Sequence, residues 1–234
     1  MLFSLFAGNG SAAQPGQEVR TERIRARMEK AFGGKAKLSQ LEYITYTIAR
    51  RSYANLDTIH TTQLWYMHLK KPSLIKLGIS GTDTVSSKCQ TAENRGSSPA
   101  CAALLRARFY NFLYLLTSPT VQFSWLKKTT YKGMKVDIIR VSEKSAPELR
   151  LDIFVKGNGE IATTSTISAT TGKYERFADE FEYVELEGGI RFPLRYEVFA
   201  DGKIIAEGWF SNISINQHKA EWQRLIGQLS AEPG

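Results

Sequence analysis

A period-2 alternation of apolar residues, repeated between residues 131 and 215, constrains this chain more than any other feature. In its most regular segment the apolar residues are Ile190, Phe192, Leu194, Tyr196 and Val198. The predicted strands cover residues 149–156, 161–170, 174–186, 190–198 and 204–215. Short turns, most of which contain glycine, separate them. This combination predicts an antiparallel meander, because successive side chains of a strand point to opposite faces.

The N-terminal half adds helices and further strands. Residues 20–32 form a predicted helix that ends at Gly33-Gly34, and residues 41–51, 58–69 and 74–79 read as strands. Residues 81–98 are small and polar and are predicted to be a loop. A central helix is expected over residues 100–117 and a short terminal one over 218–229. The fold class is therefore α+β, with mostly antiparallel strands.

The central helix carries an apolar stripe that includes Phe109, Phe112 and Leu116. Such a stripe can pack as ordinary core, or it can cover a ligand cavity on the concave face of a curved sheet. The candidate partners across the sheet are Trp65, Met67, Ile153, Phe192 and Trp209. Alternation fixes which residues share a face but not which face is concave.

The charge is unevenly divided. Residues 1–140 contain 21 Lys/Arg against 8 Asp/Glu, whereas residues 141–234 contain 10 against 15. The basic residues form no stripe interleaved with aromatic residues, so we expect no nucleic-acid partner. An anionic lipid surface or headgroup fits a basic side better. No interdomain linker interrupts the pattern, so we expect a single, monomeric domain over residues 20–229.

Residues 1–8 are apolar, and Ser11-Ala12-Ala13 resembles the small-residue cleavage site of a signal peptide. The basic segment that normally precedes the apolar run is absent. Residues 1–19 are therefore interpreted as a signal peptide that lacks its first residues, or alternatively as a disordered apolar tail. We favour the signal peptide, which predicts a periplasmic protein.

The chain has two cysteines, Cys89 and Cys101. In an exported protein they are expected to form a disulfide, whereas in the cytosol they would remain two thiols. Two cysteines and three dispersed histidines do not predict a metal site.

No motif predicts catalysis or a bound cofactor, and we expect the protein not to be an enzyme. The acidic residues at 179–187 are expected to lie mostly on a solvated face. Asp137 and Asp152 also lie in alternating segments and are expected to face solvent.

The order of these elements resembles the LolA-like family, the outer-membrane lipoprotein-sorting carriers. The resemblance covers about residues 20–216 and rests on element order and on residues 31–41, 109–119, 131–133 and 189–193. It implies an unclosed antiparallel half-barrel, covered by an N-terminal and a central helix, whose cavity accepts acyl chains. The sequence departs from the family pattern at residues 84–95, which are polar and include Cys89.

Two functions follow as expectations. The first is a soluble carrier or binding protein of the cell envelope, holding a lipid, a lipoprotein or another acyl-bearing ligand between the sheet and a helical lid, with membrane-associated proteins as further partners. The second is a structural or protein-interaction module whose central helix merely fills the core. An apolar cavity would favour the first function, and a filled core the second.

Overall fold

The computed structural model describes residues 15–54, 57–70, 75–79, 82–85, 111–144, 146–167, 174–217 and 220. The helices are α1 (Pro15–Ala31), α2 (Lys35–Ser39), α4 (Phe112–Thr117) and the short 3-10 helix η1 (Glu187–Gly189). The first strands are β1 (Tyr43–Ala54), β2 (Asp57–His68), β3 (Ile75–Ile79), β4 (Thr82–Val85), β5 (Val121–Tyr131) and β6 (Met134–Glu143). The remaining strands are β7 (Ala146–Lys156), β8 (Ile161–Ile167), β9 (Tyr174–Leu186), β10 (Ile190–Ala200) and β11 (Lys203–Ile215).

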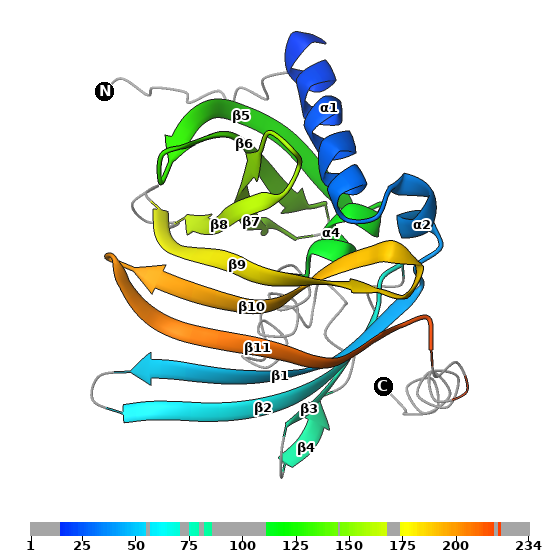
Figure 1. Cartoon of the computed structure of the whole chain (residues 1–234), viewed down its shortest axis with the longest axis vertical. Helices are drawn as coiled ribbons and strands as arrows, with labels where there is room; N and C mark the ends of the chain where they lie inside the picture. The colour runs from blue at the N-terminus through cyan, green and yellow to red at the C-terminus, as the bar shows by residue number, and fades with distance from the viewer. Residues whose placement is uncertain are drawn as a thin grey trace, which may run out of the picture.

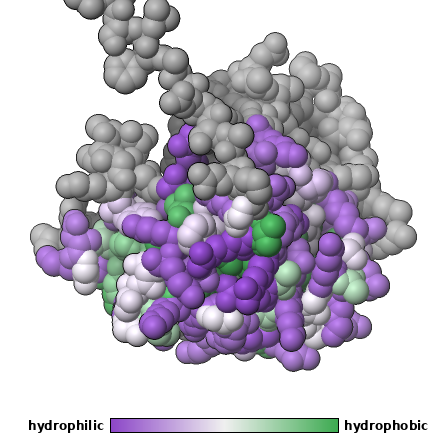
Figure 2. Space-filling model, turned by 90° about the horizontal axis from the view of Figure 1, so that it is seen from above, coloured by the Kyte–Doolittle hydropathy of each residue, from purple (hydrophilic) through white to green (hydrophobic). Residues whose placement is uncertain are grey.

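All the described strands belong to one antiparallel sheet, in the order β4-β3-β2-β1-β11-β10-β9-β8-β7-β6-β5. The sheet curls strongly but does not close, because β4 and β5 remain its two edges (Figure 1). The predicted fold class and half-barrel architecture are thus confirmed. The side seen from above is mostly hydrophilic where its residues are described, with scattered hydrophobic residues (Figure 2).

The first and last described strands of the meander meet in the middle of the sheet, where β1 pairs with β11 from Ile44↔Ile215 to Ser52↔Ala206. Asn216 fastens one end of this junction. Its side-chain oxygen accepts a hydrogen bond from the Glu42 N–H at 2.8 Å, and its amide nitrogen donates to the Gln40 carbonyl at 2.9 Å. These bonds join the connection after α2 to the end of β11.

Helix α1 packs one apolar stripe onto the sheet. Ile24, Met28 and Phe32 recur every four residues and are at most 2% exposed. Toward its N-terminus, Gln17 donates a hydrogen bond to the Trp125 carbonyl, and Thr21 Oγ1 accepts one from the Trp125 N–H. Trp125 lies on edge strand β5, so α1 satisfies backbone groups that would otherwise be open at the edge of the sheet.

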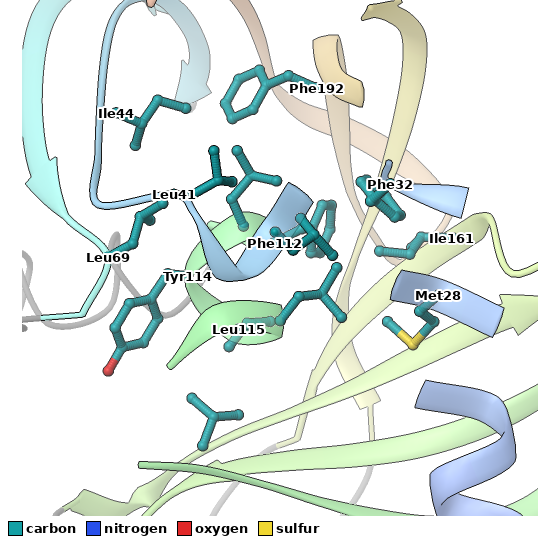
Figure 3. Packing of buried hydrophobic residues seen from close by; sticks show 14 of the residues in the cluster. Met28, Phe32, Leu41, Ile44, Leu69, Phe112, Tyr114, Leu115, Ile161 and Phe192 are labelled. Atoms are coloured by element: carbon teal, nitrogen blue, oxygen red, sulfur yellow. The ribbon is translucent and has the colours of Figure 1, made fainter. Parts of the chain in front are cut away.

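The curled sheet has apolar clusters on both faces. We call the larger one the core cluster and its side of the sheet the inner face; it receives α1, α2 and α4 (Figure 3). The second cluster lies on the outer face, where β5 to β9 curl around Val136, Ile138, Phe154 and Ala162. Tyr131 and Lys132, at the β5–β6 turn, both hydrogen bond to Asp179 on β9 and hold this curl.

Several sequence-based boundaries differ from the structure. Helix α1 begins at Pro15, ahead of the predicted residue 20. Part of the predicted loop at residues 81–98 is strand β4, which pairs Val85 with Leu77 of β3. Strand β5 precedes the point at which the meander was expected to begin. Of the predicted helix over residues 100–117, the described part is α4; Cys89, Cys101 and nearly all of the predicted terminal helix lie outside the described residues.

The expectation that Asp137 and Asp152 face solvent is wrong. Asp137 is 6% exposed and lies under α1, where Arg27 binds it at 2.8 Å and the Trp125 indole donates to it at 3.1 Å. Asp152 is completely buried on the outer face and accepts two hydrogen bonds from Arg140, at 2.8 and 3.0 Å. Paired arginines make both burials possible, because a buried carboxylate requires partners for its charge.

None of the described helices has the length and apolar character needed to cross a membrane.

Candidate functional site

The structure brings most of the predicted cavity residues together on the inner face. Those in the core cluster are Trp65 and Met67 on β2, Phe112 and Leu116 on α4, Ile153 on β7, and Phe192 on β10. Each is at most 5% exposed. They come from strands at both ends of the sheet and from the helix above it, so the cluster spans the concave face.

The remaining two candidates are not in this group. Phe109 lies outside the described residues. Trp209 lies on the outer face, where the guanidinium groups of Arg51 and Arg195 lie 5.6 and 5.8 Å from its ring centroid. Its neighbour Phe210 packs against the core cluster instead. The alternation on β11 was thus correctly recognised, but the inward-facing parity could not be chosen from the sequence.

Tyr46 on β1 is a central residue that was not among the candidates. Its ring centroid is 5.7 Å from that of Phe192, 5.4 Å from that of Phe210 and 6.4 Å from that of Trp65. The signal was available, because Tyr46 lies two residues from both Ile44 and Ile48 and therefore shares their face of the strand. These aromatic rings form a continuous apolar surface across β2, β1, β11 and β10.

Helix α4 is fixed to this surface at its N-terminus. Asn111 caps it, since its side-chain oxygen accepts a hydrogen bond from the Tyr114 N–H at 3.1 Å. The Asn111 side chain also hydrogen bonds to the Tyr46 hydroxyl. Burial raises the pKa of Tyr46, and the bond from Asn111 opposes that shift only in part. Tyr46 therefore stays neutral and contributes an apolar ring with a satisfied hydroxyl.

A second polar contact connects α4 to strand β6. The Tyr114 hydroxyl donates a hydrogen bond of 2.6 Å to Glu143 at the end of β6, and both residues are at most 1% exposed. Residues Phe112–Leu116 of α4 are all buried. The helix therefore presents apolar side chains to the sheet and is oriented by two buried polar contacts.

A different kind of depression, of about 660 Å³, lies between the β7–β8 turn and strands β9 and β10. Its lining consists of Lys156, Glu160, Glu182, Tyr183, Arg191, Arg195 and Glu197. The charges largely pair among themselves: Glu160 binds Arg191 at 2.9 Å and Lys156 at 3.4 Å, and Arg195 binds Glu197 at 2.7 Å. The hydrogen bond from Arg191 is the main cause that lowers the pKa of Glu160. This polar depression is unsuited to an acyl chain.

Among the described residues no group of three or more His, Cys, Asp or Glu side chains could hold a metal ion. In the acidic segment Glu182, Glu185 and Glu187 are exposed, as expected, whereas Asp179 is buried and the expectation is wrong for it.

Solved structures with the same architecture exist. A protein from Vibrio parahaemolyticus, provisionally named as an outer membrane lipoprotein-sorting domain, matches 90% of this chain and 97% of its own, with 10% identity and a TM-score of 0.52. A LolA superfamily protein from Nitrosomonas europaea matches 86% of this chain and 96% of its own, with 12% identity and a TM-score of 0.50. This chain has the LolA-like fold. The predicted resemblance is therefore confirmed at the level of the fold.

No protein-family model and no curated protein matches the sequence. At identities of 10% and 12%, the two structures establish the shared LolA-like architecture alone.

Proposed function

We propose that this protein is a carrier or binding protein of the cell envelope that holds an acyl-bearing ligand between the inner face of its sheet and α4. The ligand is a lipid, a lipoprotein or another molecule with an acyl chain. The shared LolA-like fold supports this proposal, and so does the apolar segment at residues 1–8, which is consistent with export to the periplasm.

The observation that carries the proposal is the continuous apolar surface of the inner face. It runs from Trp65 on β2 through Tyr46, Phe210 and Phe192 and continues to Ile153 on β7. An acyl chain requires a long, apolar, uncharged surface of this kind, because its binding depends on removing methylene groups from water. The polar residues that contact this surface, Asn111 and Tyr114, serve to position α4.

In the described state the side chains of α4 themselves cover this surface. Phe112 is 4% exposed and its ring lies 6.1 Å from that of Phe32, directly after α1. A ligand must therefore displace α4 or its side chains, and the hydrogen bonds of Asn111 and Tyr114 are the contacts that resist this movement. We propose α4 as a lid that closes in the absence of ligand.

Extraction of the protein purified from its own compartment tests the proposal most directly. We expect mass spectrometry to find acyl lipids at a molar ratio near one. In the ligand-free protein, a brominated fatty acid should quench the fluorescence of Trp65, and the quenching should largely disappear in Trp65→Phe. Trp209 lies on the outer face and therefore serves as an internal reference.

A matched pair of variants separates the lid from general stability. Phe112 on α4 and Phe154 in the second cluster are both 4% exposed, but they lie on opposite faces of the sheet. At a temperature at which both variants are folded, Phe112→Ala should weaken fatty-acid binding roughly tenfold or more, because the displaced ring would close over the bound acyl chain and burial of such a ring contributes about 1.5–3 kcal/mol. Phe154→Ala should bind like the parent protein.

The alternative is a non-enzymatic interaction module with a filled core. It would be supported if the parent protein bound no acyl ligand and Phe112→Ala cost about 3–5 kcal/mol of stability, as expected for close packing. Membrane-associated partner proteins and a monomeric state remain part of the proposal.

A further inference from the structure

The β5–β6 hairpin is an exposed basic projection. Lys127 and Lys128 on β5, Lys132 in the turn and Lys135 on β6 are all exposed. No acidic residue occurs between residues 118 and 136. The side chain of Met134, next to the turn, is 40% exposed. The hairpin thus combines four lysines with one accessible apolar side chain at its end.

Two buried acids lie on or beside the hairpin, and each already has a basic partner. Asp137 is bound by Arg27 at 2.8 Å, and Asp179 is bound by Lys132 at 2.6 Å. Within the described part of the chain, no ion pair involves Lys127, Lys128 or Lys135. Among the described residues, these three positive charges therefore have no counter-charge within ion-pair distance.

Protection of the sheet edge explains these lysines but not Met134. Charged residues on an edge strand discourage pairing with other chains, which accounts for Lys127 and Lys128 on β5. Lys135 and Met134 lie on β6 and pair with Thr130 and Tyr131 of β5, but the pairing of β6 with β7 begins only at Val136. Lys135 therefore also lies at an open edge, whereas edge protection does not explain the exposed apolar side chain of Met134.

The end of the hairpin is held in place against β9, and one side of its turn is open. Tyr131 and Lys132 both hydrogen bond to Asp179, at 3.1 and 2.6 Å. At Gly133, by contrast, an added β-carbon would meet no atom within 4 Å. A turn that is held in place in this way loses little conformational freedom when it docks on a surface.

We propose that this hairpin docks the protein, end first, on the surface of an anionic lipid bilayer. Lys127, Lys128 and Lys135 would lie close to the lipid phosphates, and Met134 would enter the interfacial region. Lys127 and Lys128 are neighbours on a strand and point to opposite faces, so the ribbon can present charge on both sides only when it approaches by its end. This inference does not depend on the acyl-binding proposal.

Flotation with lipid vesicles tests the inference. The full chain should bind vesicles of equimolar phosphatidylcholine and phosphatidylglycerol and should not bind vesicles of phosphatidylcholine alone. Binding should weaken steeply as salt is raised from about 0.01 to about 1 M, because the Debye length falls from about 30 to about 3 Å.

Charge-reversal variants locate the surface. Lys128→Glu combined with Lys135→Glu should lower the vesicle partition coefficient by about 25-fold or more, given a contribution near fivefold for each lysine at such a surface. Lys30→Glu combined with Lys35→Glu is the matched control: it changes net charge equally at exposed positions outside the hairpin. Met134→Ser should cause a smaller loss that persists at high salt.

Three outcomes would overturn the inference. The first is equal binding to both kinds of vesicle, which would indicate apolar insertion elsewhere. The second is an equal effect of the hairpin variant and its control, which would indicate attraction by net charge alone. The third is binding of a soluble polyanion but of neither vesicle, with loss of that binding in the hairpin variant. Failure of the protein to bind fatty acids would leave the inference standing, because vesicle flotation measures the surface contact alone.

Discussion

Gly208 on β11 lies directly beneath the ring of Tyr196 on β10, and a β-carbon added at Gly208 would overlap that ring. The two residues are opposite each other in the sheet. The Tyr196 ring centroid lies 5.7 Å from that of Phe210, which packs against the core cluster. The absence of a side chain at Gly208 thus allows an aromatic ring to lie against the strand backbone and to extend the apolar surface of the inner face.

Gly208→Ala should consequently destabilise the protein by about 1–3 kcal/mol, as expected for overpacking. The free energy of unfolding in urea measures the effect. Combining it with Tyr196→Ala should remove most of the additional cost, because the colliding ring is then absent. Gly157→Ala is the control, since a β-carbon there would meet no atom within 4 Å. A cost at Gly208 that persists in the double variant would contradict the steric explanation.

The cap of α4 gives a second prediction. Asn111→Ala should cost about 1–3 kcal/mol, because the Tyr114 N–H loses its acceptor and the buried Tyr46 hydroxyl loses its partner. Asn111→Ser retains a side-chain cap and should recover part of that stability. If α4 is a lid, Asn111→Ala should also speed the association of a fatty acid, which stopped-flow fluorescence can follow. Equal stability of the alanine and serine variants would show that the cap contributes nothing.

Asp137 connects α1 to the sheet. Asp137→Asn retains the shape of the side chain but removes the charge that binds Arg27 at 2.8 Å and lies 3.7 Å from Arg20. We expect a loss of about 1.5–3 kcal/mol, the contribution of a hydrogen bond to a charged group. Hydrogen exchange should show α1 loosening before the sheet. Glu22→Gln, at an exposed position on the same helix, should change stability by less than about 0.5 kcal/mol. Uniform loosening of the sheet and α1 would argue against a local role.

Tyr174 predicts how stability changes at high pH. Burial, followed by the charge of Asp152, raises the pKa of Tyr174 to about 12, and its hydroxyl donates a hydrogen bond of 3.0 Å to Asp152. An unfolded tyrosine loses its proton near pH 10, so the unfolded state ionises first. This contribution to stability is therefore complete below about pH 10 and is lost as the pH rises towards about 12.

Urea unfolding midpoints measured across that range test the prediction. Tyr174→Phe cannot ionise and should show a shallower decline than the parent protein. Some decline should remain, because burial also raises the pKa of Tyr46 and of Tyr131. Parallel pH profiles for the two proteins would show that Tyr174 does not contribute to the loss of stability at high pH.

Much of the sheet was predictable because strands such as β10 and β11 carry a regular alternation of apolar and polar residues. An extended backbone places such residues on two different faces of a sheet. The choice between the faces was not predictable. Trp209 and Phe210 are adjacent and both aromatic, and only the pairing of β11 with its neighbours shows that Phe210 joins the core cluster. The same uncertainty concealed Tyr46, the residue that connects Trp65 to Phe192.

The burial of the aspartates could not be predicted for a different reason. Asp137 follows the alternation, but its burial depends on Arg27, which is separated from it by more than a hundred residues. Strand β4 was missed because four residues in a polar segment give little periodic signal, and its existence depends on pairing with β3. Local patterns specify elements, whereas partners distant in the sequence decide burial.

The pairing of β1 with β11 also has a kinetic consequence. Ile44 cannot find its partner Ile215 until nearly the whole chain has been synthesised, because these strands lie at opposite ends of the sequence. Until then β1 can pair only with β2, and its other edge stays unpaired. Such non-local contacts slow folding and leave apolar strands accessible to aggregation. The pairing of β11 with β1 is therefore expected to be a late step in folding.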